Sequence, residues 1–197
     1  MDMLVKNTLH RYFALGGALY FCFACILVHI VRDDLSPWNR TLSIYAVGPA
    51  GWVLTLGFFS IALTQLLIAF RLYRLRQLTG DLLAVAALAV AALGILLVAI
   101  FPYPIRLPHN SGAALQLGLF PLFLLLQVAL RRDDPLRRLT FVCALLSTAF
   151  FMLLLWNGGT DYDLGTVAVA QKAQIIVNTL WLVVYSWCWP EGSRHTR

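Results

Sequence analysis

The chain has 197 residues, of which 60% are hydrophobic and 12% are charged. A soluble domain carries about 25% charged residues, so this composition excludes an ordinary water-soluble fold. The formal net charge of +6 does not predict nucleic acid as a partner, because the basic residues fall in short segments between apolar runs. That distribution is typical of a membrane protein whose loops set its orientation, with membrane lipids as its first partners.

Six apolar runs are long enough to cross a bilayer, which takes about 20 residues of α-helix. We predict an all-α integral membrane protein, in which one domain forms a compact bundle of six transmembrane helices. The first run exceeds the apolar region of a signal peptide, which has about 7–15 residues, so we expect it to be retained. The predicted spans cover residues 12–31, 44–70, 82–101, 111–130, 139–156 and 164–189.

The lysines and arginines are distributed unequally over the two sides of the predicted bundle. Eleven of the 15 lie on the side of the two termini. By the positive-inside rule, we expect a cell-membrane protein with both termini in the cytoplasm. The four on the opposite, outer side are Arg32, Arg40, Arg106 and Lys172.

The third span is rich in small residues, among them Ala84, Ala87, Ala91 and Gly94. Small side chains let the backbones of neighbouring helices approach closely. We therefore expect this span to be central in the bundle, with a homodimer interface as the alternative.

Lys172 is the one formally charged side chain within the predicted spans. A charge at the centre of a membrane helix costs about 2.5–3.5 kcal/mol on insertion scales. The ammonium group can avoid this cost by reaching the outer surface, because Lys172 lies only about two turns inside the last span. It can also face a polar cavity, or pair with an outer aspartate or a lipid phosphate.

Polar and aromatic residues recur at helical spacing along the last span, which gives one stripe. Amides that faced lipid would have no hydrogen-bond partner, so we expect the stripe to face the bundle interior. Hydrogen bonds between helices would explain it, and so would a site for a lipid or another amphiphile. The stripe consists of Gln171, Gln174, Asn178, Trp181 and Tyr185.

Two histidines near the outer side raise the question of a metal. Catalytic zinc commonly takes three protein ligands and leaves one position open. His29 and His109, completed by Asp33, Asp34, Asp161 or Asp163, are the candidate ligands. The sequence has no H-x-x-x-H or H-E-x-x-H pair, so zinc is a weak expectation, and no other cofactor is expected.

Four segments resemble a six-span family of bacteria and archaea that is catalogued as domain of unknown function 998. The resemblance covers nearly the whole chain and implies a six-helix membrane fold. It also supports His109, Gln171 and Lys172 as candidate site residues, although a lysine lacks the bidentate geometry of the arginine typical there. The segments are Ser43 to Trp52, Gly94 to Pro102, His109 to Leu122, and Gln171-Lys172 followed by Trp181.

The leading hypothesis is a polar pocket, open to the outer leaflet, that binds a lipid headgroup or a similar small amphiphile. A metal-dependent lipid hydrolase within the membrane is one alternative, and a small transporter or an assembly factor for a membrane complex is another. The sequence leaves open whether the protein is an enzyme. The candidate ligand-binding residues are Lys172, Gln171, Gln174, Asn178, Arg106, His109 and Trp181.

Overall fold

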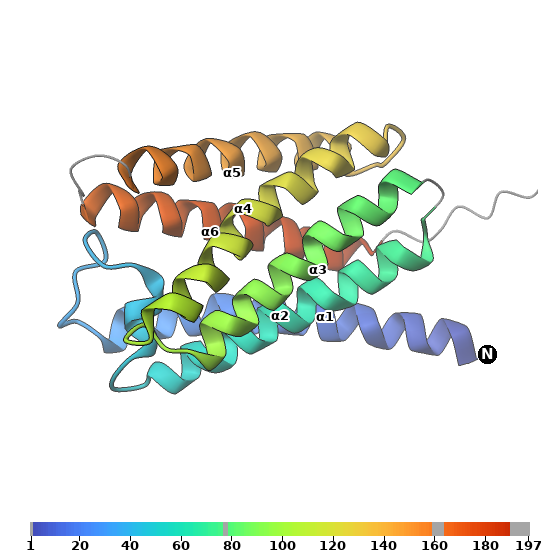
Figure 1. Cartoon of the computed structure of the whole chain (residues 1–197). Helices are drawn as coiled ribbons and strands as arrows, with labels where there is room; N and C mark the ends of the chain where they lie inside the picture. Colours follow the sequence, from blue (N-terminus) through green and yellow to red (C-terminus); the bar gives the residue numbers. More distant parts are fainter. Residues whose placement is uncertain (1, 77–78, 159–163, 190–197) are drawn as a thin grey trace, which may run out of the picture.

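The structure, a computed structural model, describes residues 2–76, 79–158 and 164–189. Within these residues the secondary structure is entirely helical, which confirms the predicted fold class (Figure 1). The elements in chain order are α1 (Asp2–Val31), the 3-10 helix η1 (Leu42–Ala46), α2 (Gly51–Arg74), α3 (Thr79–Ile100), α4 (Arg106–Leu130), α5 (Arg137–Gly158) and α6 (Leu164–Cys188).

Each of the six α-helices contains an apolar segment that is long enough to span a membrane. These segments have 21 to 25 residues and a mean hydropathy between 1.5 and 2.9. At 1.5 Å per residue they are about 31–37 Å long, which exceeds the hydrocarbon core of a bilayer at about 30 Å. The chain is therefore a multi-pass membrane protein, as predicted.

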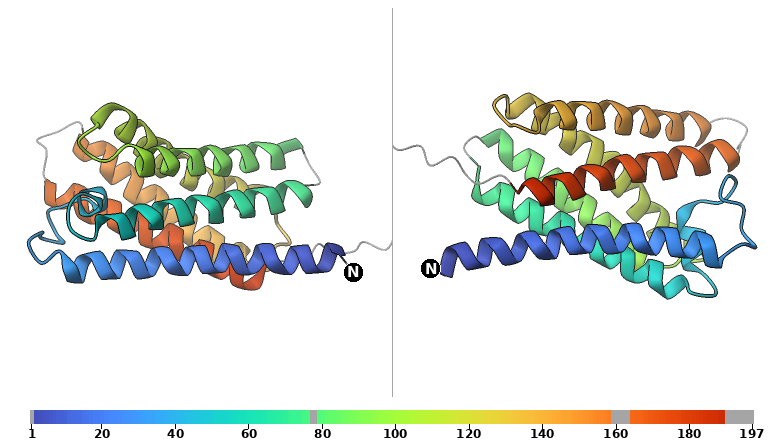
Figure 2. Two further views of the ribbon diagram at one scale, coloured as in Figure 1. Left: turned by 90° about the horizontal axis from the view of Figure 1, so that it is seen from below. Right: turned by 180° about the vertical axis from the view of Figure 1, so that it is seen from behind.

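Helices that follow one another in the chain pack side by side, as the short connections require. The helix α6 lies against both α5 and α1, so the last helix closes the bundle onto the first (Figure 2). The start of α1 and the end of α6 lie at one end, which we call the inner end after the predicted orientation. The opposite end, with residues 32–50 and 101–105, is the outer end.

The helix α3 lies at one side of the bundle, where it packs on α4 and α2. It is therefore not the central helix that the sequence predicted. The small residues serve one close crossing, because a Cβ atom built on Gly94 would lie 2.6 Å from the carbonyl oxygen of Gly112. A Cβ built on Gly112 would likewise lie 2.5 Å from the carbonyl oxygen of Gly94. The two glycines thus let the backbones of α3 and α4 touch.

The second span begins at Gly51 rather than at residue 44, because the backbone turns before it. Gly48 has a φ of 100° and Ala50 a φ of 57°, both in the left-handed region that interrupts a regular helix. The apolar residues 44–46 belong to η1 instead, which packs against the ends of α1, α2 and α6. Apolar composition therefore extended the predicted span into a structured loop.

The inner end is held by arginines that contact aromatic residues at the end of α6. Arg11 donates a hydrogen bond to the carbonyl oxygen of Trp187, and its guanidinium lies 6.0 Å from the indole ring. The guanidinium of Arg71 lies 6.0 Å from the ring of Trp189. Basic residues from α1 and α2 are therefore part of the packing at this end as well as part of the charge asymmetry.

Candidate functional site

The polar stripe of α6 faces the bundle interior, as predicted. Gln174, Asn178, Trp181 and Tyr185 are all at most 3% exposed. The amide nitrogen of Gln174 donates to the carbonyl oxygen of Leu117 at 2.6 Å. Burial of a continuous row of polar side chains is consistent with the physical reason for the prediction, since lipid offers no hydrogen-bond partners.

The inner end of the stripe serves packing rather than a site. The indole nitrogen of Trp181 donates to the hydroxyl of Thr140 at 3.0 Å. The Trp181 ring stacks on Tyr185, with the centroids 4.8 Å apart, and meets the edges of two phenylalanines of α4. Both Trp181 and Gln174 are absent from the lining of the cavity described next. Their interactions join α6 to α4 and α5.

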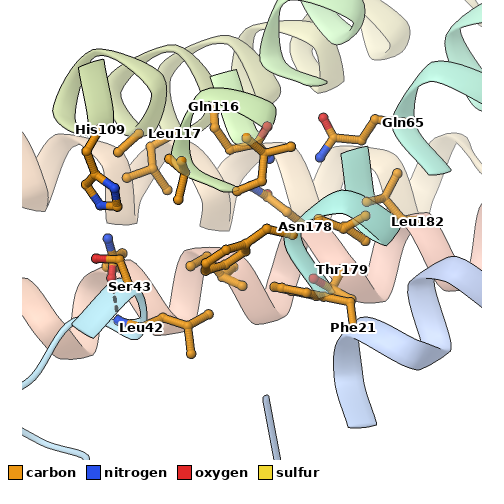
Figure 3. Close-up of a pocket in the computed structure, with 17 residues that line it drawn as sticks. Phe21, Leu42, Ser43, Gln65, His109, Gln116, Leu117, Asn178, Thr179 and Leu182 are labelled. Carbon is orange, nitrogen blue, oxygen red and sulfur yellow. Dashed lines mark hydrogen bonds between the residues drawn. The ribbon is translucent and has the colours of Figure 1, made fainter. Parts of the chain in front are cut away.

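A small cavity lies between α2, α3, α4 and α6, and it is partly open (Figure 3). Its volume, counted as the space that the centres of water molecules can occupy, is about 50 Å³. A single water needs about 10–15 Å³ by this measure, so the cavity has room for roughly three to five. Its polar lining residues are Ser43, Gln65, His109, Gln116, Gln171, Asn178 and Thr179.

Three of these residues carry buried amides that face one another. In Figure 3 the amide ends of Gln65 and Gln116 point toward each other, with Asn178 below them. Gln65 is fully buried, while Asn178 is 3% and Gln116 9% exposed. In the described part of the chain, neither Gln65 nor Asn178 has a side-chain hydrogen-bond partner, and the Gln116 oxygen has none.

Lys172 points away from this cavity, toward α1 and the outer loop. Its ammonium nitrogen donates to the carbonyl oxygen of Pro37 at 2.6 Å and lies 4.9 Å from the ring centroid of Tyr45. His29 stacks on Tyr45 with the ring centroids 4.3 Å apart. The ammonium therefore reaches the outer end along an aromatic surface, in agreement with a lysine that avoids the hydrocarbon.

A groove with a largely apolar lining runs between α1 and α6 below Lys172. Its volume is about 690 Å³, within the range of about 300–1,000 Å³ that is typical of ligand pockets. Phe21, Leu42, Ile175 and Thr179 line both the groove and the cavity, so they form the wall between the two. The groove is also lined by Leu19, Cys22, Cys25, Ile26, His29, Ile30, Lys172, Ile176, Leu180 and Val183.

The structure thus separates the residues that the sequence grouped into one site. Gln171, Asn178 and His109 line the cavity, and Gln171 also accepts a hydrogen bond from the backbone of Leu42 at 3.1 Å. Lys172 lines the groove. Arg106 is exposed at the first residue of α4 and lines neither opening.

The similarity to known proteins is limited to one family. Residues 5–188 match the model of a family described as protein of unknown function (DUF998). The chain belongs to the DUF998 family. No curated protein and no solved structure matches it.

Segments that carry the family resemblance come together in the outer half of this DUF998 protein. Ser43 and Gln171 both line the cavity, and His109 lines it from α4. Gly94 supports the same region, because its close crossing holds α4 beside α3 next to Gln116. These residues of the four segments surround the cavity or support it, whereas Lys172 lines the groove and Trp181 packs on α4 and α5.

The two histidines of the DUF998 chain lie at different openings. His109 is 3% exposed in the cavity, where its Nδ1 contacts the carbonyl oxygen of Phe101 at 2.8 Å. His29 lies in the groove, and its Nδ1 contacts the carbonyl oxygen of Cys25 at 2.7 Å. Each Nε2 therefore remains available as an acceptor or ligand.

No group of three His, Cys, Asp or Glu side chains that could hold a metal occurs in the described residues. The predicted ligands Asp161 and Asp163 lie outside those residues. Asp34 is engaged by Arg32, whose guanidinium donates to both carboxylate oxygens at 2.7 and 2.9 Å. These hydrogen bonds hold the pKa of the Asp34 carboxyl below its ordinary value of 3.8, so the pair is charged at neutral pH. It anchors the outer loop, since Arg32 also binds the carbonyl oxygen of Val47.

Gln65 is the cavity residue that the sequence analysis missed. It lies in the middle of α2, about 20 Å from the outer end of that helix at 1.5 Å per residue. A glutamine in the middle of an apolar span is itself a signal, because its amide needs a polar partner inside the bundle. The sequence could not show that this partner region is the cavity beside Asn178.

Proposed function

We propose that this protein binds a membrane phospholipid in the groove between α1 and α6. An acyl chain would lie along the apolar wall, and the phosphate would lie near the ammonium group of Lys172. The observation that carries the proposal is a single lysine at the outer end of a largely apolar groove. The proposal keeps Lys172 from the predicted site and assigns the polar stripe a separate role.

The dimensions of the groove support an acyl chain as its occupant. Its lining on α1 extends from Leu19 to Ile30, which is about 16 Å at 1.5 Å per residue. One leaflet of a bilayer contributes about 15 Å of hydrocarbon. The amide-lined cavity, at about 50 Å³, is too small to take such a chain.

The surroundings of Lys172 support a phosphate as the polar end of the ligand. An ammonium group has three donors, and the carbonyl oxygen of Pro37 takes one of them. The ring of Tyr45, fixed by its hydroxyl on the carbonyl oxygen of Leu35 at 3.1 Å, supports the ammonium from one side. Two donors remain for an anion such as a lipid phosphate.

Replacing Lys172 with methionine is expected to reduce phospholipid retention about tenfold, since a direct hydrogen bond from the ammonium group to a lipid phosphate would contribute about 1.5 kcal/mol. Methionine keeps most of the apolar stem, so the bundle should remain folded. The measurement is native mass spectrometry of protein extracted from vesicles of equal parts phosphatidylglycerol and phosphatidylcholine. Wild type should retain mainly phosphatidylglycerol, and Lys172→Met should lose that preference.

Arg40→Gln is the matched control, because it removes one positive charge from the outer loop without touching the groove. It should retain lipid as wild type does. Equal retention by Lys172→Met and wild type would show that the lysine only reaches the surface and would refute the phosphate role. A lipid-free dimer in the spectrum would assign the groove to a second copy, and stoichiometric zinc would favour the metal-dependent hydrolase.

We also propose a cell-membrane location with both termini in the cytoplasm, because the sequence assigns eleven basic residues to the side of the termini and four to the opposite side. A green fluorescent protein fused after Arg197 is expected to fluoresce, and alkaline phosphatase fused at the same place should be inactive. An alkaline phosphatase inserted after Asn39, in the outer loop, serves as the opposite control. Activity of the C-terminal phosphatase fusion would reverse the orientation.

A further inference from the structure

The middle of the bundle contains buried amide groups that have no hydrogen-bond partner among the described residues. Five side-chain atoms of Gln65, Gln116 and Asn178 have no hydrogen-bond partner in the described residues, and all three residues are at least nine-tenths buried. All three line one cavity and come from three different helices. Amides without partners are strongly unfavourable in a membrane interior, so their convergence on one cavity indicates a polar occupant.

The lining of this cavity restricts the charge of its occupant. None of its lining residues is an aspartate, glutamate, lysine or arginine. A buried ion needs a counter-charge or a metal, so both anions and cations would be poorly accommodated. His109 is the one titratable side chain of the lining. Its Nδ1 is engaged in a hydrogen-bond contact with the carbonyl oxygen of Phe101.

The hydrogen-bonding groups define what the occupant must offer. Gln65 and Asn178 each present both an amide NH₂ donor and a carbonyl acceptor, and Gln116 presents a carbonyl acceptor. A ligand that satisfies them must both donate and accept hydrogen bonds. Space for roughly three to five water-sized groups limits it to a few heavy atoms.

We propose that this cavity is a binding site for a small uncharged amide or polyol group. The proposal goes beyond phospholipid binding in the groove, because it concerns another opening and a ligand of another chemical class. The polar lining continues toward the outer end with Ser43 in η1, His109 near the start of α4 and Gln171 near the start of α6, so the ligand would enter from there. The wall formed by Phe21, Leu42, Ile175 and Thr179 keeps the two sites distinct.

Acetamide is a suitable probe, since it has four heavy atoms, one amide and no charge. Protein labelled with ¹⁵N in the glutamine and asparagine side chains is titrated with acetamide in detergent micelles. The NH₂ signal of Asn178 is expected to shift saturably, whereas sodium acetate, of similar size but charged, should leave it unchanged. In Gln65→Leu the acetamide affinity read at Asn178 should fall about tenfold, which is the loss expected when a buried hydrogen-bonding group is removed.

Gln127→Leu is the matched control. Gln127 is also a buried glutamine with a side-chain nitrogen that lacks a partner in the described residues, but it lies near the inner end of α4 outside the cavity. This variant should bind acetamide as wild type does. Cross-peaks between Asn178 and water without any saturable acetamide shift would mean a hydration site only and would overturn the proposal. Equal shifts with acetate, or unchanged affinity in Gln65→Leu, would also overturn it.

Discussion

Replacing Gly94 with valine is expected to separate α3 from α4 and to lower the free energy of unfolding by about 3 kcal/mol. A Cβ at this position would lie 2.6 Å from the carbonyl oxygen of Gly112 and 2.9 Å from the backbone nitrogen of Gln116. Both are backbone atoms of α4, so relief requires movement of the whole helix. The movement would also displace Gln116 from the amide-lined cavity.

The measurement is reversible unfolding by sodium dodecyl sulfate in mixed micelles, followed by far-ultraviolet circular dichroism. Gly16→Val is the matched control, because a Cβ at Gly16 would meet nothing within 4 Å. It makes the same chemical change within α1, where valine has a slightly better helix propensity than glycine, so the free energy of unfolding should change little. If Gly94→Val unfolds like Gly16→Val, the close contact between α3 and α4 is not a major source of stability.

Replacing Arg131 with methionine is expected to destabilise the inner end by about 2–3 kcal/mol. The Arg131 guanidinium lies 3.5 Å from a carboxylate oxygen of Asp81, whose side chain is only 5% exposed. Loss of Arg131 removes one partner of a buried carboxylate, and breaking a fully buried ion pair costs about 3–5 kcal/mol. The effect should be smaller here, because the Arg131 side chain is 21% exposed and partly solvated.

Arg132→Met tests whether this effect depends on the ion pair rather than on net charge. Arg132 is the next residue and is exposed, so its loss should change the unfolding midpoint little. The double variant Asp81→Asn with Arg131→Met should recover part of the lost stability, since the buried charge is then gone. Similar midpoints for Arg131→Met and Arg132→Met would show that the contact with Asp81 contributes nothing.

The sequence was sufficient to predict the six helices and the buried face of the last one. Runs of about 20 apolar residues require helices in a bilayer, because every backbone group must be satisfied within its own segment. The same solvent argument predicted that the row from Gln174 to Tyr185 faces inward, and the structure confirms it. The predicted start of a span was wrong where the loop before it is also apolar, as residues 44–46 in η1 demonstrate.

The grouping of side chains into sites was beyond the sequence. Gln171 and Lys172 are adjacent, yet successive helix positions differ by about 100° around the axis, and only the neighbouring helices decide what each one meets. Gln171 meets η1 and the cavity, whereas Lys172 meets α1 and Tyr45. The histidines were likewise grouped by their common depth, although they line separate openings.

By itself the sequence determined that this is a six-helix membrane protein with a buried polar row on its last helix. The physical reason is that lipid provides no hydrogen-bond partners, which constrains the composition of each segment separately. The constraint is therefore visible as a pattern along the sequence. Only the tertiary structure decided that Gln65, Gln116 and Asn178 share one cavity while Lys172 lies in a groove beside it. Those placements depend on how closely each pair of helices packs, and the contact between Gly94 and Gly112 is formed across the space between two helices rather than along one.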